Sequence, residues 1–230
     1  MAGNSLELAA IIPARGGSKG IPGKNIRLLN GKPLLTYTIE SALESRVAKD
    51  VFVSTDSEEI MRVAEASGAS VINRPPEISH DTASTESALL HGVDFIKANH
   101  GWNPEYILTL PPTSPLRKAE TIRKFISSFI PVCNEYDAML SFTECRGDYW
   151  IKANEDFSRL FPDAPRRRQD RKPLYLENSA MYVTKTESLI VTGSILGRNC
   201  TGFVINEIEA IDINEPLDLQ WAEFVLKNIL

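Results

Sequence analysis

Short apolar runs and amphipathic stretches alternate along most of the chain. Apolar runs typical of buried strands lie at residues 8–13, 51–54, 71–72, 106–110, 138–142 and 179–183. Between them, apolar residues recur at helical spacing at residues 34–43, 60–64, 84–98, 119–130 and 216–229. Strands that alternate with helices of this length predict an α/β fold, with a mostly parallel, doubly wound sheet and helices on both faces. In such a sheet, ligands bind beyond the carboxyl ends of the strands.

Residues 145–176 interrupt this alternation. The segment is rich in charged and aromatic residues, and its composition predicts no hydrophobic core of its own. We interpret it as an arm inserted within a single domain of residues 1–230, and we expect the arm to pack on a second subunit. Its expected anchors are Tyr149, Trp150, Phe157, Leu160 and Phe161. The alternative is a surface loop of one monomer.

Composition narrows the class of protein. The chain has 230 residues, of which 43% are hydrophobic, enough for one large core, and no apolar run approaches the length of a membrane-spanning helix. Its first residues lack the pattern of a signal peptide, and its three cysteines fit neither a zinc site nor a disulfide framework. We therefore expect a cytoplasmic protein that binds no membrane. A net charge of −5 also argues against general nucleic-acid binding.

Against this acidic background, the stretch from Ala14 to Lys32 carries five cations and no acid. It follows the first apolar run, and its glycines and prolines allow a sharp turn that exposes backbone N–H groups. Such a loop suits a polyphosphate, although its spacing matches neither a P-loop nor a dinucleotide fingerprint. The alternative is a solvated basic loop. Its candidate nucleotide-binding residues are Arg15, Ser18, Lys19, Lys24 and Asn25.

Two further loops carry candidate binding residues. Residues 74–85 combine a proline-stiffened turn with a Ser/Thr-rich helix start, which is also typical of an ordinary capped loop. Residues 110–117 follow the strongest apolar run and hold three prolines within five residues, which predicts a rigid turn.

An acidic stretch lies near the C-terminus, where residues 207–223 hold six carboxylates and no cation. Residues 211–214 alternate in strand fashion, so Asp212 and Asn214 are expected on one face. Two oxygen ligands on one face suit Mg²⁺, which takes few protein ligands beside waters and phosphates. The alternative is a solvated acidic cap on the last helix. A cluster of arginines at 166–168 suits a carboxylate ligand instead, because guanidinium groups bind carboxylates in a bidentate way.

These segments together resemble the acylneuraminate cytidylyltransferases, and the resemblance runs from about Leu8 to the C-terminal helix. The loop at 14–25 is similar to that family's N-terminal signature. Residues 74–85 resemble its R-P-x-E-x-x-x-D block, residues 111–117 its Q-P-T-S-P-L-R segment, and residues 212–219 its D-I-D-x-x-x-D-L metal motif. The resemblance implies a nucleotide-diphospho-sugar transferase fold and a homodimer. It also implies an enzyme that joins CMP from CTP to an acidic nine-carbon sugar, with Mg²⁺ as cofactor.

The resemblance also implies roles for individual residues. It assigns Arg15 and Lys24 to the triphosphate, Asn25 to cytosine, and Arg15, Lys24 and Asp212 to catalysis. The remaining residues that it implies are Arg74, Asp81, Thr85 and Pro111 for the nucleotide, Arg168 and Gln169 for the sugar acid, and Asp212 and Asn214 for the metal.

The sequence departs from the family pattern at two of these positions. Pro111 stands where the family has glutamine, so cytosine must be read by the backbone, Asn25 or Thr85. Asn214 replaces the second aspartate of the metal motif, which predicts weaker metal binding. The rival hypotheses are a related nucleotidyltransferase for another sugar acid, such as ketodeoxyoctonate, and a catalytically weak nucleotide-binding protein. The sequence does not identify the sugar acid, and it does not distinguish a dimer from a tetramer.

Overall fold

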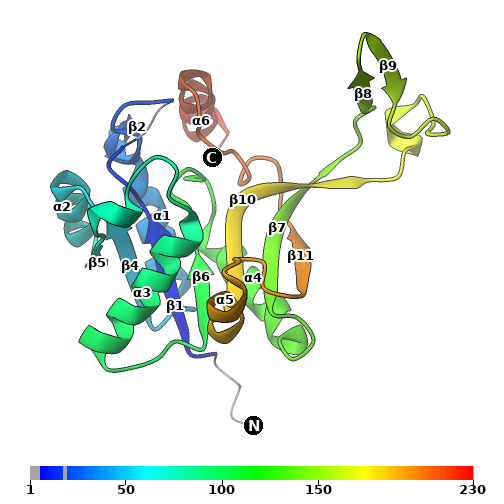
Figure 1. The fold of residues 1–230 in the computed structure, drawn as a ribbon. Coiled ribbons are helices and arrows are strands. Elements are labelled where there is room, and N and C mark those ends of the chain that lie inside the picture. Colours follow the sequence, from blue (N-terminus) through cyan, green and yellow to red (C-terminus); the bar gives the residue numbers. More distant parts are fainter. Residues whose placement is uncertain (1–5, 18–19, 230) are drawn as a thin grey trace.

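A seven-stranded sheet forms the centre of the computed structural model, which describes residues 6–17 and 20–229 (Figure 1). From one edge to the other, its strands are β11 (Cys200–Val204), β7 (Ala138–Cys145), β10 (Leu174–Lys185), β6 (Tyr106–Thr109), β1 (Leu8–Pro13), β4 (Asp50–Thr55) and β5 (Ser70–Asn73). All neighbouring pairs are parallel except those of β10, which is antiparallel to both β6 and β7. The predicted mostly parallel α/β fold is confirmed.

Helices cover both faces of this sheet, as the alternation predicts (Figure 1). Helices α3 (Thr85–His100) and α5 (Thr186–Thr192) lie on the near face in the view, and α1 (Leu34–Ser45) and α4 (Ala119–Phe129) lie behind. Helix α2 (Glu58–Ala66) lies beside β5, and α6 (Pro216–Asn228) lies beyond the carboxyl ends of the strands. Among the described residues, no helix combines the length and the apolar character needed to span a bilayer.

Short elements fill the connections. A two-stranded ribbon of β2 (Leu28–Leu29) and β3 (Lys32–Pro33) turns at Asn30 and Gly31, which both have positive φ. Asn-Gly is the residue pair that this tight turn favours. The single-turn 3₁₀ helices are η1 (Lys24–Ile26), η2 (Pro76–Ile78), η3 (Ile130–Val132) and η4 (Arg168–Asp170).

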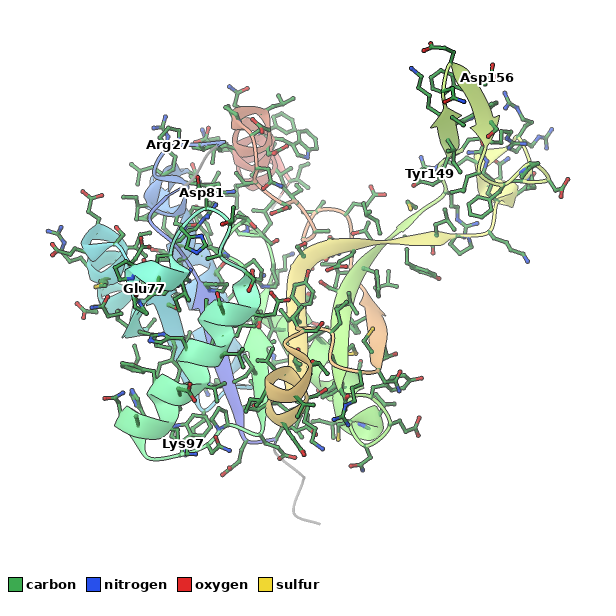
Figure 2. The ribbon with its side chains drawn as sticks, viewed as in Figure 1. Arg27, Glu77, Asp81, Lys97, Tyr149 and Asp156 are labelled. Atoms are coloured by element: carbon green, nitrogen blue, oxygen red, sulfur yellow. The ribbon has the colours of Figure 1, made fainter. Side chains whose placement is uncertain are left out.

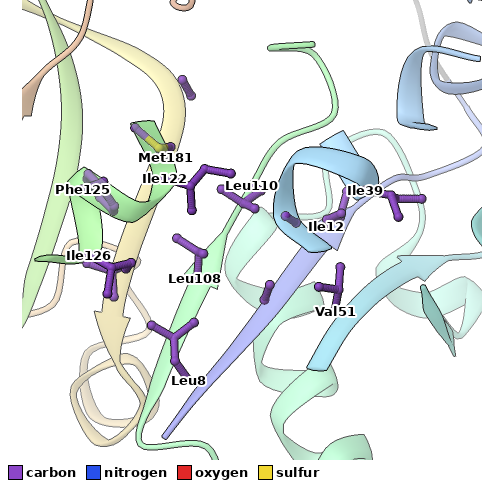
Figure 3. Close-up of a cluster of buried hydrophobic side chains, with 14 of the residues drawn as sticks. Leu8, Ile12, Ile39, Val51, Leu108, Leu110, Ile122, Phe125, Ile126 and Met181 are labelled. Atoms are coloured by element: carbon purple, nitrogen blue, oxygen red, sulfur yellow. The ribbon is translucent and has the colours of Figure 1, made fainter. Parts of the chain in front are cut away.

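Strand β1 is buried on both faces, which explains its uninterrupted apolar sequence. Because successive side chains of a strand point to opposite faces, Leu8 and Ile12 join one core cluster and Ile11 joins another. The first cluster contains the buried faces of α1 and α4 (Figure 3). The second contains the inner face of α3. Two layers of the hydrophobic core therefore share this sheet, one on each face.

Strand β10 corrects one sequence-based expectation. The apolar run at 179–183 was expected to continue the parallel βα pattern, yet it lies antiparallel between β6 and β7. The pairing of β10 with β7 shifts register between Glu177 and Tyr182, and Ser179 within the shift has a φ of 56°. Such a bulge increases the local twist of a strand and bends it. Beyond the bulge, β7 and β10 leave the sheet together as a ribbon.

The ribbon carries the predicted arm away from the rest of the molecule (Figure 1). At its far end lies a hairpin of β8 (Trp150–Ala153) and β9 (Asp156–Arg159). The five predicted anchor residues of the arm are between 40% and 64% exposed. A two-stranded hairpin with so little burial is marginally stable alone. The segment thus projects with little apolar burial, and its packing on a second subunit stays a prediction.

Charge, rather than apolar packing, holds the arm in shape. The Asp148 carboxylate accepts hydrogen bonds from Arg159 at 3.0 and 3.1 Å and from Arg171 at 3.3 Å. These arginines also donate to backbone carbonyls of the arm, including those of Pro162 and Arg166. The hydrogen bond from Arg159 lowers the pKa of Asp148. Its contribution to stability is therefore present at neutral pH and is lost only as the pH falls below the usual aspartate pKa of about 3.9.

We predict that Asp148→Asn loosens the arm while leaving the seven-stranded sheet folded. The substitution removes the charge that Arg159 and Arg171 share, so their guanidinium groups become available to a protease. Limited trypsin digestion at pH 7.5 should cleave within residues 146–172 at least severalfold faster than in the unmodified protein. Asp156→Asn, at the hairpin tip (Figure 2), is the matched control and should change the rate little. Equal rates for the two variants would contradict the prediction.

Candidate active site

A pocket lies beyond the carboxyl ends of β1, β5 and β6, where the predicted loops converge. Its volume is about 320 Å³. It is lined by Pro13, Arg15, Gly17, Lys24, Asn25, Arg74, Asp81, Ala83, Ser84, Thr85, Pro111, Pro112 and Thr113. Three separate sequence motifs thus meet in one place, as expected for a sheet whose strand ends share an edge.

The basic loop is held by polar contacts to strand β4 and the residues that follow it. The backbone N–H of Ala14 donates to the Ser54 carbonyl at 2.9 Å, and that of Gly16 donates to the Asp56 carboxylate at 2.8 Å. Residues Ser18 and Lys19, both predicted to bind nucleotide, lie outside the described residues.

Arg15 connects the first loop to the second. Its guanidinium donates to the His80 carbonyl at 3.1 Å and lies 3.3 Å from the Asp81 carboxylate. Both partners belong to the loop at 74–85, so the structure brings together two motifs that are about 65 residues apart. Arg15 and Asp81 remain partly exposed to solvent, so an incoming anion can reach this ion pair.

Asn25 lines the pocket and contacts the backbone of the basic loop. Its side-chain N–H donates to the Arg15 carbonyl at 2.9 Å. Its Oδ1 is buried and, among the described residues, has no hydrogen-bond partner. A buried acceptor without a partner is energetically costly, so a ligand that donates a hydrogen bond here gains affinity. Thr85, at the start of α3, and Pro111 line the same pocket.

Arg74 lies at the pocket wall and is itself buried. Its guanidinium donates to the Ser54 hydroxyl at 3.1 Å and to the Ser54 carbonyl at 2.7 Å. Burial lowers its pKa, and the nearby Asp56 carboxylate opposes that shift. Arg74 therefore fixes the end of β4 and adds positive charge at the back of the pocket.

Lys24 joins the pocket to the acidic segment. Its Nζ donates to the Ile213 carbonyl at 2.8 Å and lies 3.4 Å from the Asn214 amide oxygen. Burial lowers the pKa of this ammonium group, and the Asp212 carboxylate opposes the shift. The ammonium group of Lys24 thus connects the basic loop to the segment that precedes α6.

Residues 211–214 correct a second expectation, because they do not form a strand. They run beside the loop after β6, where the Ile213 N–H donates to the Thr113 carbonyl at 2.8 Å. Asp212 and Asn214 nevertheless lie together, since the Asn214 amide donates to Asp212 Oδ2 at 2.7 Å. Asp212 Oδ1 is buried and has no hydrogen-bond partner among the described residues.

Most of the other acidic side chains in this segment have structural partners. Glu215 and Asp218 form a reciprocal capping box at the start of α6. Glu209 is buried and accepts hydrogen bonds from the Lys118 backbone and the Asn206 side chain. Within residues 6–17 and 20–229, no group of three or more His, Cys, Asp or Glu side chains could hold a metal. The acidic run is therefore partly a helix cap, as the alternative interpretation predicts, and a metal-binding role for Asp212 stays a prediction.

The predicted sugar-acid residues are not near the pocket in a single chain. Arg168 and Gln169 lie on η4 in the arm, which projects away from the sheet (Figure 1). Asp56, whose carboxylate anchors the basic loop, belongs to none of the sequence motifs. An aspartate that directly follows a buried strand was the available signal, but sequence separation hid its partner, Gly16.

Comparisons with known proteins agree on a family. The model of the cytidylyltransferase family matches residues 9–142. The CMP-N,N′-diacetyllegionaminic acid synthase of Legionella pneumophila is 35% identical over 239 residues, which cover 94% of each chain. The N-acylneuraminate cytidylyltransferase of Escherichia coli is 31% identical over 220 residues, which cover 94% of this chain and 51% of that protein. The chain thus spans about half the length of some curated relatives that it matches.

A solved structure supports the fold. The structure of CMP-2-keto-3-deoxy-manno-octonic acid synthetase complexed with CTP superposes with a TM-score of 0.68, covering 97% of this chain and 100% of the other. The two sequences are 17% identical, so this likeness concerns the fold alone.

We predict that Gly20→Ala destabilises the protein. A Cβ atom at Gly20 would overlap the backbone carbonyl oxygen of Asn214, so the first and last loops would have to separate. Overpacking of this kind costs about 1–3 kcal/mol, and each kcal/mol lowers Tm by roughly 2–4 °C in a chain of this size. Gly17→Ala is the matched control, because its Cβ would meet its nearest neighbour, Asp81, at 3.9 Å. Thermal unfolding of both variants is the measurement, and equal Tm values would contradict the prediction.

Proposed function

The chain belongs to the acylneuraminate cytidylyltransferase family, and from that membership we propose that it transfers a cytidylyl group from CTP to an acidic nine-carbon sugar. A hydroxyl oxygen of the sugar acid attacks the α-phosphorus in line. The bond to the β-phosphate breaks, pyrophosphate leaves, and the hydroxyl proton passes to solvent. Such a reaction depends on positioning and on charge stabilisation rather than on a protein nucleophile.

The observation that carries this proposal is the position of Lys24. Its ammonium group lines the pocket and also contacts the segment that holds Asp212. A triphosphate in the pocket would therefore lie between the cations Arg15 and Lys24 and the Asp212 carboxylate. Ser18 and Lys19 of the same loop are further proposed contacts to the phosphates.

The acceptor left by Asn25 suits a base that carries an exocyclic amine, such as cytosine. The exocyclic amine of cytosine is a donor, and Asn25 Oδ1 is a buried acceptor without a partner among the described residues. Pro111 offers only its carbonyl at this wall, and Thr85 offers a hydroxyl. Arg74 and Asp81 complete the proposed nucleotide site. We therefore assign base recognition to Asn25, with Thr85 and the backbone in support.

The donor set suits Mg²⁺ held mainly by substrate. Asp212 Oδ1 is buried without a partner among the described residues, and the Asn214 amide oxygen lies beside Lys24. Asp212 would hold the ion, with Asn214 as a second oxygen ligand once its contact to Lys24 is released. Bound Mg²⁺ would neutralise charge on the phosphates and orient them.

A homodimer supplies the proposed sugar-acid contacts. Arg168 and Gln169 lie on the arm, outside their own pocket, while the arm exposes aromatic side chains that favour an interface. We propose that the arm of each copy reaches toward the pocket of the other. Arg168 would then bind the carboxylate of the sugar acid in a bidentate way.

The test is pyrophosphate release with CTP and Mg²⁺. The panel of acceptors is N-acetylneuraminic, legionaminic and pseudaminic acids and ketodeoxyoctonate. We expect turnover with one nine-carbon acid, and a kcat about 10²-fold lower for Arg15→Ala and for Asp212→Ala, as for the loss of one charge-stabilising contact. Arg27→Ala removes an exposed cation of the same region and is the matched control (Figure 2).

Other outcomes separate the alternatives. Turnover with ketodeoxyoctonate alone would favour the related nucleotidyltransferase. Protection against unfolding by CTP without any pyrophosphate release would favour a nucleotide-binding protein. Unchanged kcat in both Arg15→Ala and Asp212→Ala would contradict the assigned roles.

We predict that Asn214→Asp lowers the Mg²⁺ concentration needed for half-maximal activity by about tenfold, equivalent to about 1.4 kcal/mol. The substitution adds a carboxylate beside Asp212, and attraction between opposite charges strengthens as charge is added. The measurement is pyrophosphate release over a titration of Mg²⁺. Gln220→Glu adds the same charge on the exposed surface of α6 and should leave the requirement unchanged. An equal requirement in Asn214→Asp and the unmodified enzyme would overturn the proposed metal position.

A further inference from the structure

Arg117 carries a charge inside the protein, at the end of the loop that follows β6. The residue is 2% exposed, and its Nη1 donates to the Ala180 carbonyl within the bulge of β10. Its Nε and Nη2 atoms are buried and have no hydrogen-bond partner within residues 6–17 and 20–229. Burial lowers the pKa of Arg117 to about 9, and the nearby Glu209 carboxylate opposes this shift.

Stability alone does not explain a buried arginine of this kind. Removing a charge from water is costly unless hydrogen bonds and an opposite charge compensate for it. Only part of the Arg117 guanidinium is hydrogen-bonded, and apolar side chains of similar volume often replace buried charges without loss of stability. The segments that this charge connects point instead to a role in the candidate active site.

Glu209 provides the opposite charge and is itself 5% exposed. Its Oε2 accepts the Lys118 backbone N–H at 2.9 Å, and its Oε1 accepts the Asn206 side-chain N–H at 2.8 Å. Accepting from a donor at each oxygen suits an ionised carboxylate. A buried carboxylate in turn needs a compensating positive charge, which Arg117 supplies.

This carboxylate holds the segment that contains Asp212. Through Lys118, the N-cap residue of α4, Glu209 attaches the segment to the loop after β6 three residues before Asp212. One residue after Asp212, the Ile213 N–H donates to the Thr113 carbonyl of the same loop at 2.8 Å. Asp212 therefore lies between two contacts to a single loop.

The second of these contacts also reaches the basic loop. The Ile213 carbonyl accepts a hydrogen bond from Lys24 Nζ at 2.8 Å, so a shift of residues 206–213 would move both Asp212 and the partner of Lys24. Arg117 and Glu209 are not among the described residues that line the pocket. Any effect they have on the reaction therefore passes through the segment that they hold.

We propose that Arg117 and Glu209 are positioning residues, whose paired charges hold residues 206–213 against the loop after β6 and thereby fix Asp212 beside Lys24. The inference rests on the proposed function, because it assigns the pair to the metal-binding role proposed for Asp212. Residues that orient a metal ligand often affect metal affinity as strongly as a change of about 10- to 100-fold.

The first test measures the segment directly, by hydrogen–deuterium exchange of peptides that cover residues 205–214. Arg117→Met keeps a long side chain but leaves the Glu209 carboxylate without its compensating charge. Exchange in these peptides should become about tenfold faster or more, since breaking a buried pair is strongly destabilising and exchange reports local opening. Arg117→Lys keeps a charge and should restore part of the protection. Unchanged exchange in Arg117→Met would overturn the proposal.

The second test measures the Mg²⁺ concentration for half-maximal pyrophosphate release. Arg117→Met should raise it by about tenfold or more, with little change in the KM for CTP. Ile96→Ala is the matched control, because it removes a buried side chain from the other core layer and lowers stability without touching this segment. Equal Mg²⁺ requirements in the two variants, or faster exchange with an unchanged requirement, would overturn the positioning role.

A second variant keeps the proposal testable if Arg117→Met does not fold. Glu209→Gln keeps the size of the side chain, but its amide oxygen can accept from only one side, and its NH₂ group faces the other donor. Either Lys118 or Asn206 then loses its partner. Exchange and the Mg²⁺ requirement should both rise, and unchanged values would contradict the proposal.

Hydrogen exchange also separates this inference from the proposed function. Turnover in the unmodified chain, with exchange and Mg²⁺ requirement unaffected by Arg117→Met, would refute the inference and leave the reaction standing. Absence of turnover in the unmodified chain would refute the reaction, and the exchange data would still decide whether the two charges hold the segment.

Discussion

The burial of β1 on both faces is the constraint on which the rest of the structure depends. Its side chains fill two core layers at once, so the strand has no freedom to shift in register or depth. The basic loop begins where this strand ends. Because the strand is fixed, the backbone of Ala14 and Arg15 leaves the sheet at a fixed point, between the ends of β4 and β6. A rigid strand beneath a glycine-rich loop is what allows a polyphosphate site to be pre-organised.

Polar contacts then fix the loop itself. Asp56 accepts the Gly16 N–H, Asn25 donates to the Arg15 carbonyl, and Lys24 donates to the Ile213 carbonyl. Each contact joins the loop to itself or to a different part of the chain, so the pocket is a product of the whole domain. Two oxygen atoms, Asn25 Oδ1 and Asp212 Oδ1, are buried without partners among the described residues. Both belong to side chains to which we assign a proposed ligand, the base for Asn25 and Mg²⁺ for Asp212.

The arm follows a different physical rule from the sheet. It exposes apolar side chains and relies on the charge of Asp148, shared among arginines, for its shape. The side chains of Asp148, Arg159 and Arg171 are only 20%, 16% and 13% exposed, so these two ion pairs are largely shielded from solvent.

The sequence alone determined the strands and helices whose pattern is local. The runs at 8–13 and 106–110 and the helical spacing at 84–98 predict β1, β6 and α3, because burial on a defined face imposes a period on the sequence. The motifs also located the pocket, since parallel strand ends share an edge. Arg15, Lys24, Asn25, Arg74, Asp81 and Thr85 all line it.

Only the tertiary structure decided what depends on pairing between distant segments. The direction of β10, the path of residues 211–214 and the partners of Asp56 and Glu209 carry no local signature. A strand that pairs antiparallel in the middle of the sheet has the same apolar sequence pattern as a parallel strand. Likewise, the sequence does not distinguish a carboxylate that caps a helix from one that binds a metal. The hydrogen-bond partner of the carboxylate, which only the structure gives, makes that distinction. These features were set by which groups the fold brought together, because burial requires each polar group to find a partner in space rather than in sequence.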